Sequence, residues 1–281
     1  DALAADFLRR TDKQRTFNLV DDFTIPFPVT VIAEIMGIEP ERRTDFKRWS
    51  DCLVGVLSER TGPLWEKYRT GVFELINFFS ETFIQRRASG LEYDDLLGLL
   101  LQAEDEARID IKEMVSYCTL LLAAGNETTT DLIGGMVPEL LANPEQLRFL
   151  QDHSELIPRA IEEGLRHCSP VQGIYRRAVR DIEISGTVIR AGQDVAPLFG
   201  AANRDPAAFV DPNCFDIERT DNRHLAFGVG VHFCIGAPLA RLEGKLALEA
   251  LLREFPKMQL AGDHLRWSPT AAIWGPASLP V

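Results

Sequence analysis

One apolar segment, from about Asp110 to Leu141, constrains the fold of this chain more than any other. Between Met114 and Ala124 it is apolar at nearly every position, so a helix over this segment has no face suited to water. A helix that is hydrophobic all round is a buried one. We therefore expect the central helix of the fold here, with the rest of the chain packed around it.

The periodicity of the sequence changes after Pro170. Most of the first 170 residues fit helices, whereas short alternating runs joined by turns follow Pro170 and predict small strands. The helices are expected at Val29 to Met36, Arg42 to Leu57, Leu64 to Arg87, Asp94 to Gln102, Ser154 to His167 and Pro238 to Phe255. The strands are expected at Tyr175 to Val179, Asp181 to Ile184, Thr187 to Ile189 and Asp194 to Pro197. The fold class is therefore mainly α with a small β part, in one domain over 1–281 whose helical part is 1–170.

Composition excludes several classes of function. The net charge of −12 argues against nucleic acid as a partner, and no run of about 18 apolar residues predicts a membrane span. The acidic, amphipathic first residues do not resemble a signal peptide. Five cysteines without CxxC spacing fit free thiols in a reducing cytoplasm and no zinc site. We expect a cytoplasmic monomer.

A glycine-punctuated loop from Phe227 to Gly236 carries Cys234 just before the last long helix. Pro238 suits the first turn of that helix, and the partial positive charge of a helix N-terminus favours a thiolate at Cys234. Gly228, Gly230 and Gly236 leave space for a bulky flat group, and Phe227 and Phe233 supply apolar cover. A thiolate in such a loop is one way in which proteins hold haem iron. A buried structural cysteine is the alternative.

Two further stretches carry polar residues inside predicted helices. Ala124, Gly125, Glu127 and Thr128 lie in the middle of the central helix, where Gly and Thr are poor helix formers. The Thr128 hydroxyl can donate back to the Ala124 carbonyl, Gly125 leaves room for a small molecule, and Glu127 adds an ionisable group. By itself, the segment fits a helix kink with satisfied polar side chains better than it fits a functional site.

Glu163 and Arg166 face each other at i,i+3 on a helix. A solvated pair of this kind contributes only about 0.2–0.5 kcal/mol.

The pattern Phe227-x-x-Gly230-x-His232-x-Cys234-x-Gly236 resembles the haem-thiolate signature of the cytochrome P450 family, of the soluble bacterial type. Ala124-Gly125-x-Glu127-Thr128 resembles its oxygen-activation segment, and Glu163-x-x-Arg166 its ExxR pair. The resemblance implies a cytochrome P450 fold that is N-terminally truncated, because the family's first strands have no counterpart before Asp1.

The resemblance also implies roles for individual residues. Cys234 would be the metal ligand of haem b (iron protoporphyrin IX), with Thr128 and Glu127 catalytic in proton delivery. Arg219 would join Glu163 and Arg166 in a structural cluster. The haem-binding set implied is Cys234, His232, Arg176, Phe227, Gly228, Gly236, Ala124 and Gly125, with His232 and Arg176 on the haem propionates and Arg177 a second candidate. A positive patch of Arg223, His224, Arg241 and Lys245 would dock the electron donor.

The function implied is a monooxygenase that inserts one oxygen atom of O2 into an apolar small molecule, using electrons from a ferredoxin or flavin-type partner. Within the haem class, a peroxide-driven peroxygenase is the alternative. A haem- or ligand-binding fragment without turnover is another, and a helical domain without cofactor a third. Substrate identity is not encoded in these motifs.

Overall fold

The computed structural model describes residues 2–11, 16–58, 61–262, 265–268 and 272–281. The chain forms two compact units. Residues 21–130 make up one unit, here called the central unit, and residues 1–20 with 131–281 make up the other, here called the thiolate unit. Helix α6 (Ile111–Ala142) contributes to both.

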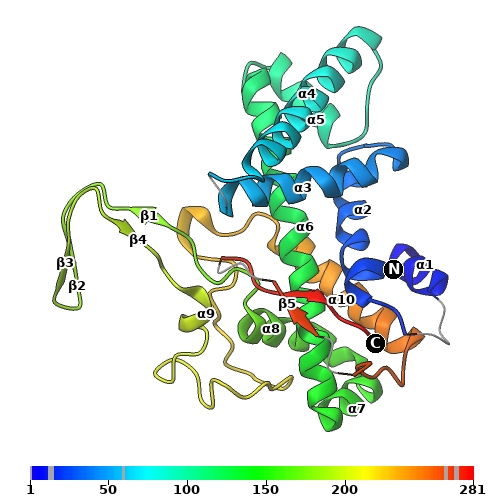
Figure 1. Ribbon diagram of the computed structural model, residues 1–281, viewed down its shortest axis with the longest axis vertical. Coiled ribbons are helices and arrows are strands. Elements are labelled where there is room, and N and C mark those ends of the chain that lie inside the picture. Colours follow the sequence, from blue (N-terminus) through cyan, green and yellow to red (C-terminus); the bar gives the residue numbers. More distant parts are fainter. Residues whose placement is uncertain (1, 12–15, 59–60, 263–264, 269–271) are drawn as a thin grey trace. The chain divides into compact units, whose positions relative to one another are not determined.

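The central unit is helical. Its elements are the π-helix Val20–Thr24 except for its first residue, α2 (Pro26–Ile35), a 3₁₀ turn at Pro40–Arg42, α3 (Arg43–Ser58), α4 (Trp65–Ser89), α5 (Leu96–Asp105) and the first part of α6. Helices α3 and α4 pack side by side (Figure 1). Phe46, Trp49 and Phe79 are buried between them, with the Phe46 and Trp49 ring centroids 5.8 Å apart. These aromatic side chains form core, as their helical spacing predicts.

Burial along α6 differs from the sequence-based prediction. Every residue from Thr129 to Pro138 is buried, whereas Leu120, inside the segment expected to be buried on all faces, is 62% exposed. Leu120 and Ala123 line a cavity of about 590 Å³ in the central unit. The prediction for 114–124 is therefore wrong on one face of the helix, because that apolar face borders a cavity instead of packed side chains.

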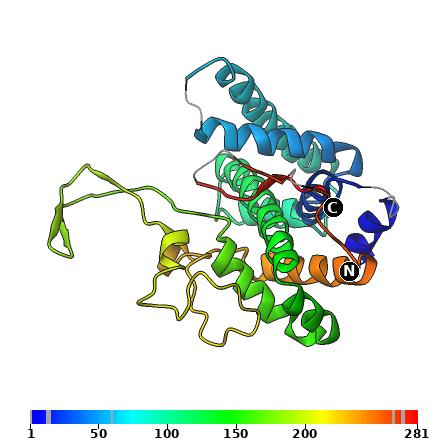
Figure 2. The same ribbon diagram turned by 60° about the horizontal axis from the view of Figure 1, so that its bottom comes forward.

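The thiolate unit contains the remaining helices. They are α1 (Ala2–Arg10), the end of α6, α7 (Pro144–Asp152), a 3₁₀ turn at Ser154–Leu156, α8 (Ile157–Cys168), α9 (Phe199–Ala202), a 3₁₀ turn at Gly230–His232 and α10 (Ala237–Glu254). Helix α10 packs against both α8 and α1. The pairing of α1 (blue) with α10 (orange) can be followed in Figure 1 and Figure 2.

The strands are short and all belong to the thiolate unit. Antiparallel pairs join β1 (Arg176–Arg177) to β4 (Asp194–Val195), β2 (Ile182–Ile184) to β3 (Thr187–Ile189), and β5 (Arg266–Trp267) to β6 (Pro276–Ser278). Ser185 and Gly186 both have positive φ, as a two-residue hairpin loop requires. The mainly α class with a small β part is confirmed, although β1 and β4 are shorter than predicted. None of the described helices has the length and apolar character needed to cross a bilayer.

Candidate functional site

The loop before α10 holds Cys234 at the start of the helix. The Cys234 N–H donates to the Phe227 carbonyl at 2.9 Å, and the Ala237 N–H donates to the Cys234 carbonyl at 3.2 Å. Gly228 and Gly230 have φ of +66° and +71°, which favours glycine at both positions. Helix α10 begins at Ala237 with Pro238 in its first turn. Short-range hydrogen bonds and glycine conformations therefore determine the shape of the loop and the position of the Cys234 thiol.

Apolar side chains of this loop lie uncovered. Val231 is 99% exposed and Ile235 is 77% exposed, and Val229 and Phe233 are also exposed. A Cβ added at Gly230 would meet nothing within 4 Å. Contiguous exposed apolar surface marks a binding site. A thiol, an apolar surface and open space above a glycine fit a flat, largely apolar group ligated through sulfur, so the residues present fit haem.

His232 and Arg176 are exposed, as residues that reach ligand carboxylates must be. The Arg176 guanidinium bonds only its neighbour's backbone, the Tyr175 carbonyl at 3.0 Å, among the described contacts. Arg177 forms a two-pronged ion pair with Asp194 at 2.8 and 3.0 Å. Arg176 therefore has the freer guanidinium of the two candidates.

The polar segment of α6 remains helical throughout. The Thr128 hydroxyl donates to the Ala124 carbonyl at 2.8 Å, which confirms the back-bond predicted from sequence. Ala124 is exposed, while the side of Gly125 where a Cβ would stand faces Ile32 of α2, 3.5 Å away. The exposed surface of the segment is therefore at Ala124 and not at the Cα of Gly125.

Glu127 is held by groups that sequence reasoning missed. Lys47 of α3 donates to its Oε1 at 3.2 Å, and Ser50 and Asn126 donate to the same oxygen at 3.4 and 3.2 Å. Burial disfavours the charge of Lys47, but the carboxylates of Glu127 and Asp51 outweigh burial and raise the Lys47 pKa. Lys47 precedes Glu127 by 80 residues, and no local signal marks the pair.

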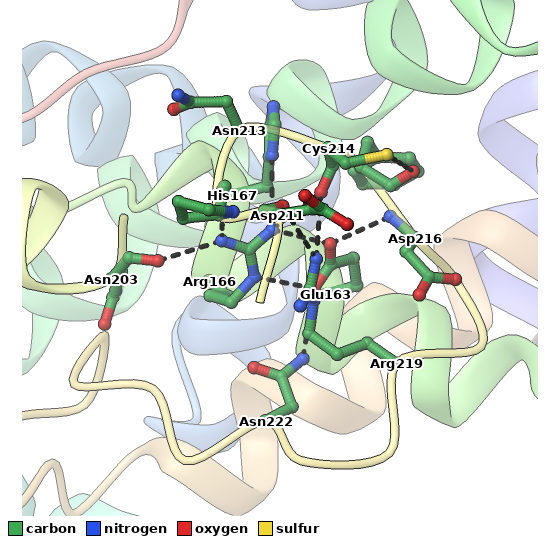
Figure 3. Close-up of polar contacts among 12 residues, drawn as sticks. Glu163, Arg166, His167, Asn203, Asp211, Asn213, Cys214, Asp216, Arg219 and Asn222 are labelled. Carbon is green, nitrogen blue, oxygen red and sulfur yellow. Dashed lines mark hydrogen bonds and ion pairs between the residues drawn. The ribbon is translucent and has the colours of Figure 1, made fainter. Parts of the chain in front are cut away.

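The structure brings Glu163, Arg166 and Arg219 together in a buried cluster (Figure 3). Glu163 and Arg166 are fully buried and joined by two hydrogen bonds of 2.7 and 2.8 Å. Arg219 donates to Glu163 at 3.1 Å, and the Asp216 N–H donates to Glu163 at 2.9 Å. The cluster therefore joins α8 to the irregular segment that precedes the cysteine loop.

The arginines of this cluster also satisfy backbone carbonyls of that segment. Arg166 donates to the carbonyls of Asn203, Pro212 and Cys214 at 2.7 to 2.9 Å. Arg219 donates to the carbonyl of Val210 at 2.8 Å. A segment without regular secondary structure needs such donors, because buried carbonyls without partners are costly.

The predicted positive patch is not present as expected. The His224 side chain is buried and donates to Glu162, and Arg241 forms a two-pronged ion pair with the same carboxylate at 2.6 and 2.9 Å. Arg223 pairs with Asp221, and Lys245 pairs with Glu249. Each of these residues thus has an acidic partner, so the patch has less net positive charge than the sequence predicts. Docking of an electron donor there stays a prediction.

Glu162 gives a prediction for acid stability. Burial raises its pKa, but the hydrogen bonds from His224 and Arg241 outweigh burial and lower the pKa to about 2. In the unfolded chain the pKa of a glutamate is about 4.3, so the stabilisation from Glu162 is complete above pH 4.3 and is lost as pH falls towards 2.

Between pH 5 and pH 3, the urea midpoint of the wild type should fall more than that of Glu162→Gln. Glu155→Gln, at an exposed position, should follow the wild type. If the urea midpoints of all three proteins fell by the same amount between pH 5 and pH 3, the lowered pKa of Glu162 would be contradicted.

Comparisons with known proteins agree on one family. The sequence model of cytochrome P450 matches residues 29–264. Cytochrome P450 107B1 of Saccharopolyspora erythraea is 40% identical over all of this chain and 68% of its own length. Steroid C26-monooxygenase of Mycobacterium tuberculosis is 39% identical over 94% of this chain and 72% of its own length. The chain thus spans about two thirds of the length of these relatives.

A solved structure agrees with the sequence comparisons. P450BioI in complex with acyl carrier protein carrying hexadec-9Z-enoic acid superposes with a TM-score of 0.93 at 36% identity, over 99% of this chain and 72% of that one. The fold of this chain therefore matches that of a solved cytochrome P450 that also shares about a third of its residues.

Proposed function

Because this chain belongs to the cytochrome P450 family and its relatives include a steroid C26-monooxygenase, we propose that it is a haem-thiolate monooxygenase acting on an apolar small molecule. Electrons would come from a ferredoxin or flavin-type partner. The observation that carries the proposal is Cys234, placed just before the first turn of α10 in a loop whose apolar side chains lie uncovered. That arrangement suits a large flat ligand bound through sulfur.

Bound haem b would supply the iron at which O2 is activated. Cys234 is the residue proposed to hold it through Sγ, with Phe227, Gly228 and Gly236 beside the ligand. His232 and Arg176 are proposed to donate to its two carboxylates, because charged donors form strong hydrogen bonds to carboxylate oxygens. Glu163, Arg166 and Arg219 are proposed to keep the preceding segment, and with it the loop, in place.

Proton delivery is assigned to Thr128 and Glu127. The Thr128 hydroxyl already has its hydrogen directed at the Ala124 carbonyl, so its oxygen is left to accept a hydrogen bond. Glu127, held by Lys47 and Ser50, is an ionisable group one residue away on the same helix.

An apolar substrate is supported by the cavity of the central unit. It measures about 590 Å³, and its lining includes Leu53, Val56, Ile76, Val115, Leu120 and Ala123. Mostly apolar cavities of several hundred Å³ are typical of small-molecule sites. Steroid C26-monooxygenase and the fatty-acyl complex of P450BioI are relatives whose names point to long, largely apolar molecules. We therefore propose a molecule of that class.

The test is the carbon monoxide difference spectrum of the reduced, haem-reconstituted protein. The wild type should give the band characteristic of thiolate-ligated haem, and Cys234→Ala should lose it because no other group replaces the sulfur. Cys214→Ala, which removes an exposed thiol of the same unit, is the matched control and should keep the band. A wild-type protein without the band, or a band that survives in Cys234→Ala, would refute the proposal.

A further inference from the structure

Glu162 joins two segments that lie on either side of Cys234 in the sequence. Glu162 lies on α8. It accepts hydrogen bonds from His224, in the segment before the cysteine loop, and from Arg241, in the second turn of α10. His224 is 4% exposed and Arg241 is 40% exposed. We call Glu162, His224 and Arg241 the Glu162 clasp. It lies outside the buried cluster of Glu163, and no motif in the sequence marks it.

The clasp is linked to Cys234 through Phe227. The Arg241 guanidinium lies 4.6 Å from the centroid of the Phe227 ring, and the Phe227 carbonyl accepts the Cys234 N–H at 2.9 Å. A guanidinium over an aromatic face is attracted by the ring. Arg241 therefore contacts the residue that bonds the Cys234 backbone.

The hydrogen bonds also assign the charges within the clasp. The Ala226 N–H donates to His224 Nδ1 at 3.2 Å, so Nδ1 carries no proton and Nε2 donates to Glu162. The two-pronged ion pair with Arg241 is then the main charge partner of the Glu162 carboxylate within the clasp. The hydrogen bond to Glu162 and the charge of that carboxylate outweigh partial burial and raise the pKa of Arg241. Arg241 and its counter-charge thus lie beside the ring of Phe227, the residue whose carbonyl accepts the Cys234 N–H.

We propose that Glu162 is a positioning residue that neutralises Arg241 and holds it over Phe227, and so sets how readily iron bound to Cys234 accepts an electron. This inference rests on the proposed function. Charge close to a redox centre shifts its potential: an added positive charge favours the reduced form and an added negative charge favours the oxidised form. Glu162 would hold Arg241 beside Phe227, and its negative charge would offset most of the positive charge of Arg241 at the iron.

The experiment is a spectroelectrochemical titration of the haem-reconstituted wild type and four variants. Glu162→Gln leaves Arg241 without its counter-charge, so the ferric to ferrous potential should move to more positive values. Arg241→Gln leaves Glu162 unbalanced, so the potential should move to more negative values. Each shift corresponds to about a fivefold change in the reduction equilibrium, since the pair is partly exposed. Glu162→Asp, which keeps the charge, should lie closer to the wild type than Glu162→Gln does.

Arg253→Gln is the matched control, because Arg253 is an exposed cation of α10 that also pairs with a carboxylate, three turns beyond Arg241. Its potential should equal that of the wild type. Shifts of the same sign in Glu162→Gln and Arg241→Gln, or no shift in either, would overturn the role of the clasp while the thiolate band persists. Absence of that band in the wild type would instead refute the proposed function, and the clasp proposal with it.

Discussion

Glu163→Gln is expected to lower the free energy of unfolding by about 3–5 kcal/mol, because it leaves Arg166 as a buried charge without its counter-ion. Both side chains are fully buried, and Glu163 also accepts from Arg219 and from the Asp216 N–H. Glutamine has the same size but only one acceptor oxygen for these donors. Urea denaturation followed by far-UV circular dichroism measures the loss.

Two further variants separate charge from packing in this cluster. Arg166→Lys keeps the positive charge but cannot reach the carbonyls of Asn203, Pro212 and Cys214 together, so it should destabilise strongly as well. Arg159→Ala, on the same helix with one long hydrogen bond of 3.4 Å to the Glu218 carbonyl, should cost about 0.5 kcal/mol or less. If Glu163→Gln were as mild as Arg159→Ala, the cluster would not organise this unit.

Glu127→Gln is expected to reduce turnover by about 10²-fold or more, the range found when a positioned acid–base group is removed. Glutamine preserves the donors from Lys47 and Ser50 to Oε1 but cannot exchange a proton. The measurement is the rate of product formation with a surrogate ferredoxin system and an apolar substrate, selected from steroids and long-chain fatty acids by its binding spectrum. Substrate affinity should change little, because the proposed role is in proton transfer.

The control for this prediction is Glu74→Gln. Glu74 is an exposed carboxylate of the central unit that pairs with Arg48, the residue of α3 next to Lys47, at 2.6 Å. It should keep wild-type turnover. Lys47→Met should give a smaller loss than Glu127→Gln, because Ser50 and Asn126 still donate to Glu127. Full turnover in Glu127→Gln would remove this carboxylate from the mechanism.

The order of the elements and the positions of the motifs could be read from the residues alone. The segment around Thr128 shows why, since its hydroxyl bonds the carbonyl four residues earlier and needs nothing else in the protein. The same is true of Cys234, whose place follows from two glycines of positive φ and a proline that begins the next helix. The extent of the strands was less predictable, because β1 and β4 depend on pairing with each other across 16 intervening residues.

The sequence by itself determined which residues carry chemistry, because helix starts, turns and back-bonds depend on neighbours within about four positions. Only the tertiary structure decided which partners they meet. Lys47 reaches Glu127 from 80 residues away, and Glu162 pairs with His224 and Arg241 of the expected docking patch. Likewise, Leu120 belongs to an apolar run but borders a cavity. Ion pairs and cavities arise where separate elements pack together, and a local pattern does not specify that packing.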